Sequence, residues 1–356
     1  MTRPTRATIH LSALRNNLAL ARRVAPGARV LAVIKANAYG HGLLRAADAL
    51  QSADGFALVE LDAAVQLRDS AYRGRIVLLE GFFEANELAH FAQHRLTSVV
   101  HHVDQVMMLE QGAAAAPIDV FVKLNTGMNR LGLRLESLRG VLERLRACAN
   151  VGDITLMTHF ACADDEKGVQ WQLENFQRAT AGIDLPTSMA NSATLLRYPE
   201  LAQQWLRPGI MLYGASPFPD RSAHDIGLEP AMTFASRIIA TQDLARGDTV
   251  GYGSDFTASG PLRIGIVACG YADGYPRHAP TGTPIVVEGR RTRTVGRVSM
   301  DMLSVDLTGL PDAGVGADVL MWGGALPVEE VARVAGTISY ELLCALAARV
   351  PVAGID

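Results

Sequence analysis

The strongest constraint on the fold is a regular alternation of short apolar segments with longer amphipathic ones before residue 215. The apolar segments are typical of buried strands, and the segments between them carry apolar residues at helical spacing. The predicted strands are 29–34, 55–59, 75–79, 97–100, 118–124, 153–158, 187–190 and 206–212, and the clearest helices are 61–72, 84–94, 135–148 and 170–181. Strands that alternate with helices form parallel sheets. Eight such units favour an α/β fold with a closed, TIM-like (β/α)₈ barrel, and an open parallel sheet is the alternative.

The pattern changes near residue 217. A segment rich in Pro, Asp, Ser and Gly begins there, and short β-rich runs follow. The runs are 233–241, 262–268, 284–287, 302–307 and 318–322, with helices expected near 327–335 and 339–349. We therefore predict a barrel over residues 1–227 and a mostly-β C-terminal domain over residues 228–356. Residues 1–10 are candidates to pair with this second domain.

Composition narrows the class of protein. A net charge of −3 gives no electrostatic reason to expect nucleic acid or an anionic membrane as a partner. No apolar run approaches the roughly 20 residues of a membrane span, and the first residues do not resemble a signal peptide. The cysteines show no metal-ligand spacing, which is typical of free thiols in a reducing compartment. We expect a soluble cytoplasmic protein without a metal site.

A lysine loop follows the first predicted strand, in the segment Val33-Ile34-Lys35-Ala36-Asn37-Ala38-Tyr39-Gly40-His41-Gly42. Lys35 ends a buried strand, and burial disfavours the charged ammonium, so the free amine can form a Schiff base. The alternative is an ordinary strand-end lysine whose head reaches water. Tyr39 lies close enough to contact a phosphate at the same rim, and the alternative is that it packs under the loop.

Polar residues also follow two later strands, where barrels build their active sites. Arg130, in the segment 123–132, can bind a carboxylate through paired N–H bonds or can form a surface salt bridge. His159 comes directly after the predicted strand 153–158. It is a base or a structural histidine, and without a second ligand at metal spacing we discount a metal.

The last two predicted strands lead into loops suited to phosphate. Barrels often bind phosphate between these loops through backbone N–H groups and a hydroxyl. Ser192, beside Asn191, supplies the hydroxyl, and Gly209, two residues after Arg207, leaves room for close approach of the backbone. These loops are the clearest physical indication of a phosphate-bearing ligand.

The blocks from Lys35 to Ser339-Tyr340-Glu341 together resemble the alanine racemase family, whose members are barrel-type pyridoxal-phosphate enzymes. The resemblance covers nearly the whole chain. It implies that Lys35 binds the cofactor pyridoxal 5'-phosphate and serves as one catalytic base. It also implies that Tyr252 is the second base, which reaches the cofactor from the partner subunit of a homodimer.

The same resemblance assigns the remaining site residues. Arg207 matches the arginine at the pyridine nitrogen, and His159 matches the histidine that links this arginine to the catalytic tyrosine. We expect this cationic His159–Arg207 pair to lower the proton affinity of Tyr252. The other cofactor positions are Tyr39, Asn191, Ser192, Gly209, Ile210 and Tyr340; the substrate positions are Arg130, Tyr271, Met300 and Asp301; and Lys123 matches a lysine that is often carbamylated.

The resemblance implies racemisation of L-alanine and D-alanine, because two bases on opposite faces can remove and return the Cα proton. Alternatives are a broad-specificity amino-acid racemase and a barrel-type decarboxylase. Such decarboxylases pair the ring nitrogen with a carboxylate, whereas Arg207 occupies that position here. A protein that only carries the cofactor on Lys35 is a further alternative, but single-domain carriers lack the β domain that bears Tyr252.

Overall fold

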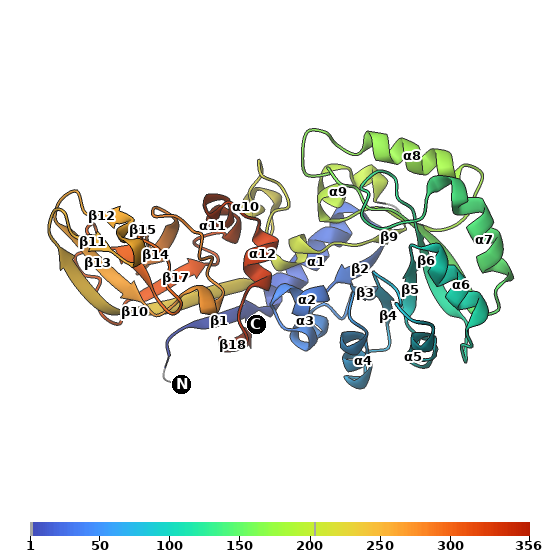
Figure 1. Ribbon diagram of the computed structural model, residues 1–356, viewed down its shortest axis with the longest axis horizontal. Coiled ribbons are helices and arrows are strands. Elements are labelled where there is room, and N and C mark those ends of the chain that lie inside the picture. The colour runs from blue at the N-terminus through green and yellow to red at the C-terminus, as the bar shows by residue number, and fades with distance from the viewer. Residues whose placement is uncertain (1–2, 203) are drawn as a thin grey trace.

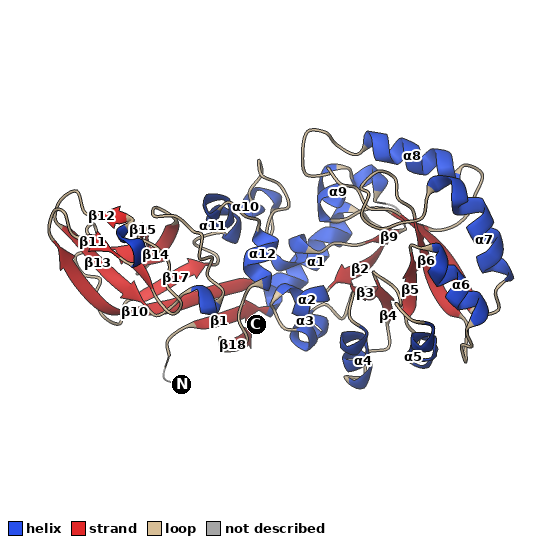
Figure 2. Ribbon diagram, viewed as in Figure 1, coloured by secondary structure: helices blue, strands red, loops and turns tan. Residues whose placement is uncertain are grey.

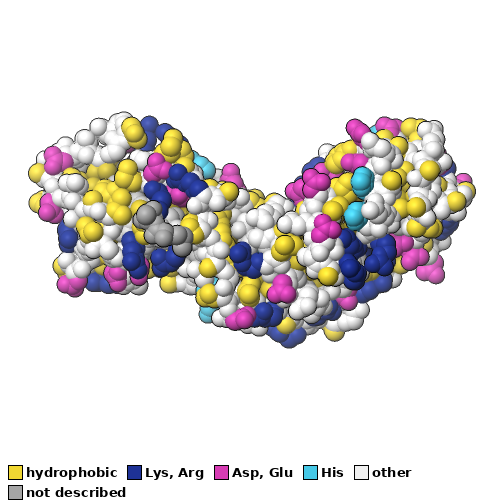
Figure 3. Space-filling view, turned by 90° about the horizontal axis from the view of Figure 1, so that it is seen from below, with side chains coloured by type: hydrophobic (Ala, Val, Ile, Leu, Met, Phe, Trp, Pro, Cys, Tyr) yellow, Lys and Arg dark blue, Asp and Glu magenta, His cyan; other side chains and the backbone are white. Residues whose placement is uncertain are grey.

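A computed structural model describes residues 3–202 and 204–356 and has two lobes joined by a narrower waist (Figures 1 and 3). In these residues the first lobe contains an eight-stranded parallel sheet with the order β9-β2-β3-β4-β5-β6-β7-β8. Its strands are β2 (Arg29–Val33), β3 (Gly55–Leu58), β4 (Arg75–Leu78), β5 (Thr97–Val100), β6 (Ile118–Lys123), β7 (Val151–Met157), β8 (Thr187–Ser188) and β9 (Trp205–Leu206). A parallel bridge between Asn191 and Arg207 joins the two ends of the sheet and closes the barrel.

Helices cover the outside of this barrel (Figure 2). They are α1 (Leu11–Val24), α3 (Leu43–Ala49), α4 (Leu61–Asp69), α5 (Leu88–Gln93), α6 (Val103–Gln111), α7 (Leu138–Ala147), α8 (Gln170–Thr180) and α9 (Ser192–Arg197). Because each strand is enclosed by the barrel interior on one side and by helices on the other, both of its faces are buried. Residues 30–33 and 56–58 are accordingly at most 5% exposed, which explains their unbroken apolar sequences.

The second lobe is a closed antiparallel sheet. In the described residues six strands pair in a ring with the order β10-β13-β16-β15-β14-β17, and β1 and β18 extend it from β10. The strands are β1 (Arg6–His10), β10 (Met232–Leu244), β13 (Leu262–Val267), β14 (Pro284–Val287), β15 (Arg290–Val295), β16 (Leu303–Asp306), β17 (Asp318–Trp322) and β18 (Val352–Ile355). The first strand of the chain thus lies in the second lobe, antiparallel to β10.

Short helices α10 (Ala223–Ile226), α11 (Val328–Ala335) and α12 (Ser339–Cys344) lie near the waist (Figure 1). The turn α2 (Lys35–Tyr39) packs against α12, so the C-terminal part of the chain contacts the lysine loop. In the described residues one large cluster of buried apolar side chains extends through both lobes, and a small second cluster in the β lobe contains Val250, Ile264 and Val295. Within the described residues, none of the helices combines the length and the apolar character that crossing a bilayer requires.

The predicted strand 206–212 is wrong beyond its first residue. β9 ends at Leu206, and residues 210–213 form a buried 3₁₀ turn. Pro208 has no N–H for the ladder, so the chain leaves the sheet there. The prediction also missed β15, whose sequence Arg-Arg-Thr-Arg-Thr-Val is largely polar and is buried only at its end.

Candidate active site

A cavity of about 720 Å³ opens at the carboxyl ends of the barrel strands. Lys35 follows β2, Lys123 ends β6 and His159 follows β7, so three separate strands deliver side chains to one place. The predicted site residues that line it are Lys35, Tyr39, Lys123, Arg130, His159, Asn191, Ser192, Arg207, Gly209, Ile210 and Tyr340. The described residues therefore gather the predicted cofactor positions in a single cavity.

The lysine loop is a left-handed turn rather than an irregular loop. Ala36, Asn37, Ala38 and Tyr39 all have φ between 51° and 54°. Such a conformation costs about 1–2 kcal/mol for each residue other than glycine, so surrounding contacts must hold it. Gly40 follows with φ 79°, and a Cβ there would overlap the carbonyl oxygen of Leu343 in α12. This turn directs Tyr39 toward the loop after β9.

Hydroxyl and backbone N–H groups converge beside Gly209. The backbone N–H groups of Gly209 and Met211 donate to Ser192 Oγ at 2.8 Å and 3.4 Å, which leaves the Ser192 hydroxyl proton free to donate. The Tyr39 hydroxyl lies so near that a Cβ on Gly209 would be 2.7 Å from it. Burial raises the pKa of Tyr39 and of Tyr340, so both hydroxyls stay protonated and can donate. Such a group of donors suits a phosphate.

Arg207 is a buried cation with neutral partners. Its Nη1 donates to Ser188 Oγ at 2.6 Å, and its Nη2 donates to the carbonyl oxygens of Thr158 at 2.8 Å and Met189 at 3.4 Å. None of these acceptors is a carboxylate. Burial lowers the pKa of Arg207 to about 10, which still leaves the guanidinium charged at neutral pH.

His159 lies between Arg207 and Asn191. Its Nδ1 is 3.5 Å from Arg207 Nη2, and its Nε2 is 3.4 Å from Asn191 Nδ2. The guanidinium and the Asn191 amide N–H₂ both only donate, so a neutral ring, which has one acceptor nitrogen, can accept from one of them at a time. Burial and then the charge of Arg207 hold the pKa of His159 well below its usual range. A neutral His159 leaves Arg207 as the charged member of the predicted His159–Arg207 pair, and the effect of this pair on Tyr252 stays a prediction.

Lys123 is a second perturbed cation in this cavity. Its side chain is buried, and burial together with the charges of Arg207, Arg130 and Lys35 lowers its pKa to about 8. Glu80 acts in the opposite direction and raises this pKa. With this pKa about a tenth of the amine is free at pH 7 and about half at pH 8, far more than for an ordinary lysine.

The predicted site residues of the second lobe do not line this cavity. Three of them are exposed: 73% for Tyr252, 37% for Tyr271 and 53% for Met300. Tyr252 lies in a 3₁₀ turn between β11 (Thr249–Val250) and β12 (Phe256–Thr257), which are on the left in Figure 1. Asp301 instead accepts a 2.6 Å bond from Arg349 Nη2. A single chain thus leaves Tyr252 away from Lys35.

Sequence reasoning missed several residues that line the cavity. Glu80 and His101 follow β4 and β5, so the strand-end rule that identified Lys123 and His159 applies to them as well. Phe83 lies on the rim and is 64% exposed. Cys344 comes from α12, and no local sequence signal connects it with the barrel.

Comparison with known proteins settles the family. The family model of the alanine racemase N-terminal domain matches residues 9–217, and that of the alanine racemase C-terminal domain matches residues 231–353. The chain belongs to the alanine racemase family. The alanine racemase of Nitrosospira multiformis is 58% identical over 352 residues, which cover 98% of this chain and 99% of that protein. The alanine racemase of Paraburkholderia phytofirmans is 54% identical, with 99% of each chain covered.

Solved structures of the alanine racemase family have the same fold over the full length. The crystal structure of the biosynthetic alanine racemase from Pseudomonas aeruginosa superposes with a TM-score of 0.98, at 47% identity and 100% coverage of both chains. The alanine racemase from Acinetobacter baumannii gives a TM-score of 0.94 at 36% identity, with 99% of this chain and all of that chain covered. The barrel followed by a β domain is therefore the alanine racemase architecture.

Proposed function

We propose that the protein is an alanine racemase, which interconverts L-alanine and D-alanine with pyridoxal 5'-phosphate as its cofactor. Membership of the family and identity to named alanine racemases over almost the full length support the activity. One observation carries the proposal: Lys35, a group of phosphate-binding donors and a buried arginine without an acidic partner line the same cavity.

The residues present suit the cofactor. Gly209 lacks the side chain that would collide with the Tyr39 hydroxyl, and the space beside it is bounded by backbone N–H groups and Ser192 Oγ. Tyr39, Ser192, Gly209, Ile210 and Tyr340 would hold the phosphate, with Asn191 and His159 alongside, and Lys35 would hold the aldehyde carbon. The bound cofactor supplies an electron sink that makes the Cα proton of an amino acid removable.

Arg207 favours racemisation over the alternative decarboxylase. A guanidinium keeps its charge and does not readily transfer a proton to a ring nitrogen. Its acceptors in the described residues are a hydroxyl, backbone carbonyls and the ring of His159, none of them a carboxylate. Arg207 would therefore leave the bound cofactor a weaker electron sink than a carboxylate partner would, which favours return of the Cα proton over side reactions. Arg207 would thus tune the cofactor toward proton transfer.

Two bases would act on opposite faces of the substrate. Lys35 would exchange the Cα proton at Nζ on one face, and Tyr252 of the partner subunit would exchange it at Oη on the other. Each group is the base for one enantiomer and the acid for the other. The 73% exposure of Tyr252 and its position outside its own chain's cavity support a homodimer with shared active sites.

Substrate recognition would involve groups from both lobes. Arg130 lines the cavity and can bind the amino-acid carboxylate, with Met300, Asp301 and Tyr271 contributed by the partner subunit. Tyr340 reduces the space for larger side chains, which favours alanine over the substrates of a broad-specificity racemase. Lys123 has the free amine that reaction with CO₂ requires, and the resulting carbamate anion would be stabilised by the positive charge of Arg130 and Arg207.

Chiral chromatography tests this function. We expect the purified protein with added pyridoxal phosphate to convert L-alanine into an equal mixture of enantiomers, and Lys35→Ala to abolish the conversion. L-serine and L-lysine should react much more slowly, and no CO₂ should be released from any substrate. Release of CO₂ would identify a decarboxylase, and cofactor binding without any turnover would identify a carrier.

A further inference from the structure

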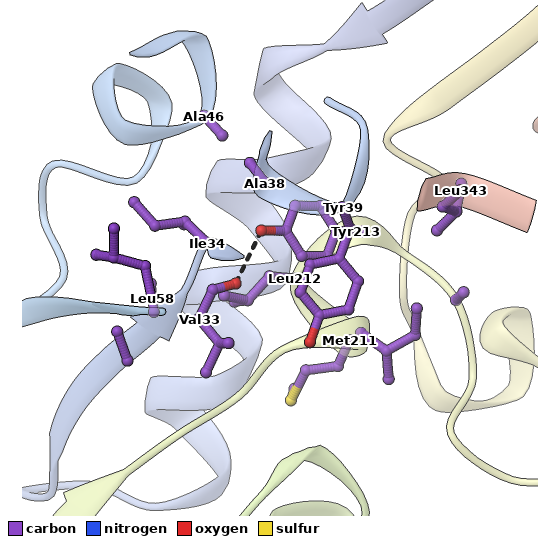
Figure 4. Packing of buried hydrophobic residues seen from close by; sticks show 14 of the residues in the cluster. Val33, Ile34, Ala38, Tyr39, Ala46, Leu58, Met211, Leu212, Tyr213 and Leu343 are labelled. Atoms are coloured by element: carbon purple, nitrogen blue, oxygen red, sulfur yellow. Dashed lines mark hydrogen bonds between the residues drawn. The ribbon is translucent and has the colours of Figure 1, made fainter. Parts of the chain in front are cut away.

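His41 is a fully buried residue behind the lysine loop that the proposed reaction does not use. Its ring lies 4.6 Å from the ring of Tyr213, and Tyr213 stacks on Tyr39 at 4.6 Å. Figure 4 shows Tyr39 and Tyr213 together with the bond from the Tyr213 hydroxyl to the Val33 carbonyl oxygen, which measures 2.8 Å. His41 therefore ends a row of three rings that connects β2 with the left-handed turn.

The imidazole of His41 binds the turn itself. Its Nδ1 lies 2.9 Å from the carbonyl oxygen of Tyr39 and 3.1 Å from that of Ala38. Both partners only accept, so Nδ1 must carry the proton. Nε2 has no hydrogen-bond partner among the described residues. A neutral ring with its proton on Nδ1 satisfies this geometry, and burial, which lowers the pKa of His41 to about 4, favours the same form.

The turn needs such support because its conformation is unfavourable by itself. Residues 36–39 are left-handed without a glycine among them, and each costs about 1–2 kcal/mol. Asn37 Oδ1 accepts from the Leu43 N–H at 2.8 Å, and Arg45 Nη1 donates to the His41 carbonyl oxygen at 2.8 Å. Asn37 thus connects the turn to α3 through its side chain, and backbone bonds such as that from the Gly42 N–H to the Asn37 carbonyl oxygen also span it. The His41 ring binds the carbonyl oxygens of Ala38 and Tyr39 instead.

We propose that His41 is a positioning residue: its neutral imidazole, protonated on Nδ1, holds residues 36–39 in the left-handed conformation that presents Lys35 and Tyr39 to the cavity. His41 itself does not line the cavity. The consequence for catalysis rests on the proposed function, but the effect on the turn does not. Small displacements of a reacting group lower rates by up to about a hundredfold, which sets the size of the expected effect.

His41→Asn and His41→Leu form the test pair. The two side chains are similar in size and both lack the ring, but only asparagine can donate a hydrogen bond. We expect H41L to speed backbone hydrogen–deuterium exchange in residues 38–42 by about tenfold or more, and H41N to retain most of the protection. Borohydride reduction in the presence of pyridoxal phosphate should label Lys35 less in H41L than in H41N, as mass spectrometry would detect.

Kinetics and a matched control complete the design. H41L should lower kcat/KM for alanine by about ten- to a hundredfold, mainly through kcat, and H41N should restore most of it. His10→Leu is the control, because it also removes an imidazole hydrogen bond, 2.8 Å to Thr233 Oγ1, but one that joins β1 to β10 and does not involve the turn. It should leave exchange in residues 38–42 unchanged.

Several outcomes would overturn the role of His41. Equal rates of backbone hydrogen–deuterium exchange in residues 38–42 of H41L and H41N, whether both fast or both slow, would show that the hydrogen bond donated by residue 41 does not hold the turn. Loss of protection in His10→Leu would point to a general loss of stability. Absence of racemisation by the wild-type protein would refute the proposed function alone, because the exchange comparison needs no turnover.

Discussion

At the scale of single residues, the cavity concentrates positive charge. Lys35, Lys123, Arg130 and Arg207 line it, and Glu80 is the one acidic residue among its described lining residues. Burial strengthens the mutual repulsion of these cations, which is visible in the lowered pKa of Lys123. A cavity of this kind stabilises a phosphate and a carboxylate, and it is destabilising when no anion is bound.

The pKa of Lys123 predicts a pH-dependent stability. Because its folded-state pKa is about 8, below the usual 10.5, the unfolded chain binds more protons between these values. Stability therefore rises with pH through that window. We expect Lys123→Met to stabilise the cofactor-free protein by about 3 kcal/mol at pH 7, with the gain declining above pH 8.

Urea unfolding in CO₂-free buffer measures this effect. Lys167→Met is the matched control, because Lys167 is exposed and no pH-dependent gain is expected there. A gain for Lys123→Met that is the same at pH 7 and pH 10.5 would contradict the account. Dissolved CO₂ should stabilise the wild-type protein at pH 8 but not Lys123→Met, since only the lysine can form a carbamate.

At the scale of elements, the sequence was informative wherever local pattern determines structure. The predicted strands 97–100 and 284–287 coincide with β5 and β14, whose residues are almost all buried and mostly apolar, with Thr97 and Ser98 as buried polar exceptions. The left-handed turn could not be predicted, since Ala36 and Ala38 intrinsically favour right-handed backbone. It packs against Leu343 from the far end of the chain, a tertiary contact that no local sequence signal indicates, and the bond from His41 that we propose to hold it is visible only once the turn has formed.

The candidate site was also predictable only in part, where strand ends identified its residues. Strand ends identified Lys35, Lys123 and His159, because the barrel brings these ends together. The neutral state of His159 was not predictable, since it depends on burial and on the charge of Arg207. Cys344 was missed because α12 reaches the cavity only through tertiary packing.

The contact between the turn and α12 predicts the effect of a pair of glycine substitutions. Gly27 and Gly40 both have positive φ, but a Cβ has open space at Gly27 and overlaps the Leu343 carbonyl oxygen at Gly40. Gly27→Ala should cost about 1 kcal/mol from backbone strain. Gly40→Ala should cost about 1–3 kcal/mol more and weaken cofactor binding, because α12 carries Tyr340.

Urea unfolding and titration with pyridoxal phosphate compare the two variants. Both variants have the same backbone strain, so the difference between their free energies of unfolding measures the effect of the steric overlap at Gly40. Equal stabilities and equal cofactor affinities would mean that the turn does not need its close contact with α12.

At the scale of the whole molecule, the two lobes divide the proposed machinery. Lys35 and the cofactor positions lie in the barrel lobe, and Tyr252 lies exposed in the β lobe. If the homodimer completes each site with the partner's Tyr252, a mixture of Lys35→Ala and Tyr252→Phe subunits should regain activity. Random pairing makes half of the dimers mixed, and each mixed dimer has one site with both bases. About a quarter of the wild-type activity is therefore expected.

Mixed dimers can be isolated through two different affinity tags, and mass spectrometry would verify their composition. Each variant alone should be nearly inactive. Inactive mixed dimers of verified composition would contradict a site shared between subunits.

Proton exchange at Cα tests the two-base mechanism most directly. The purified protein with pyridoxal phosphate is incubated with L-alanine in D₂O, and proton NMR and chiral chromatography follow the label and the configuration. We predict deuterium in D-alanine from the earliest time points and final equality of the enantiomers. For Tyr252→Phe, incubated separately with L-alanine and with D-alanine, we predict exchange without inversion for only one enantiomer, the one whose Cα proton faces Lys35. Exchange with retained configuration in the wild-type protein, or no exchange at all, would contradict the mechanism.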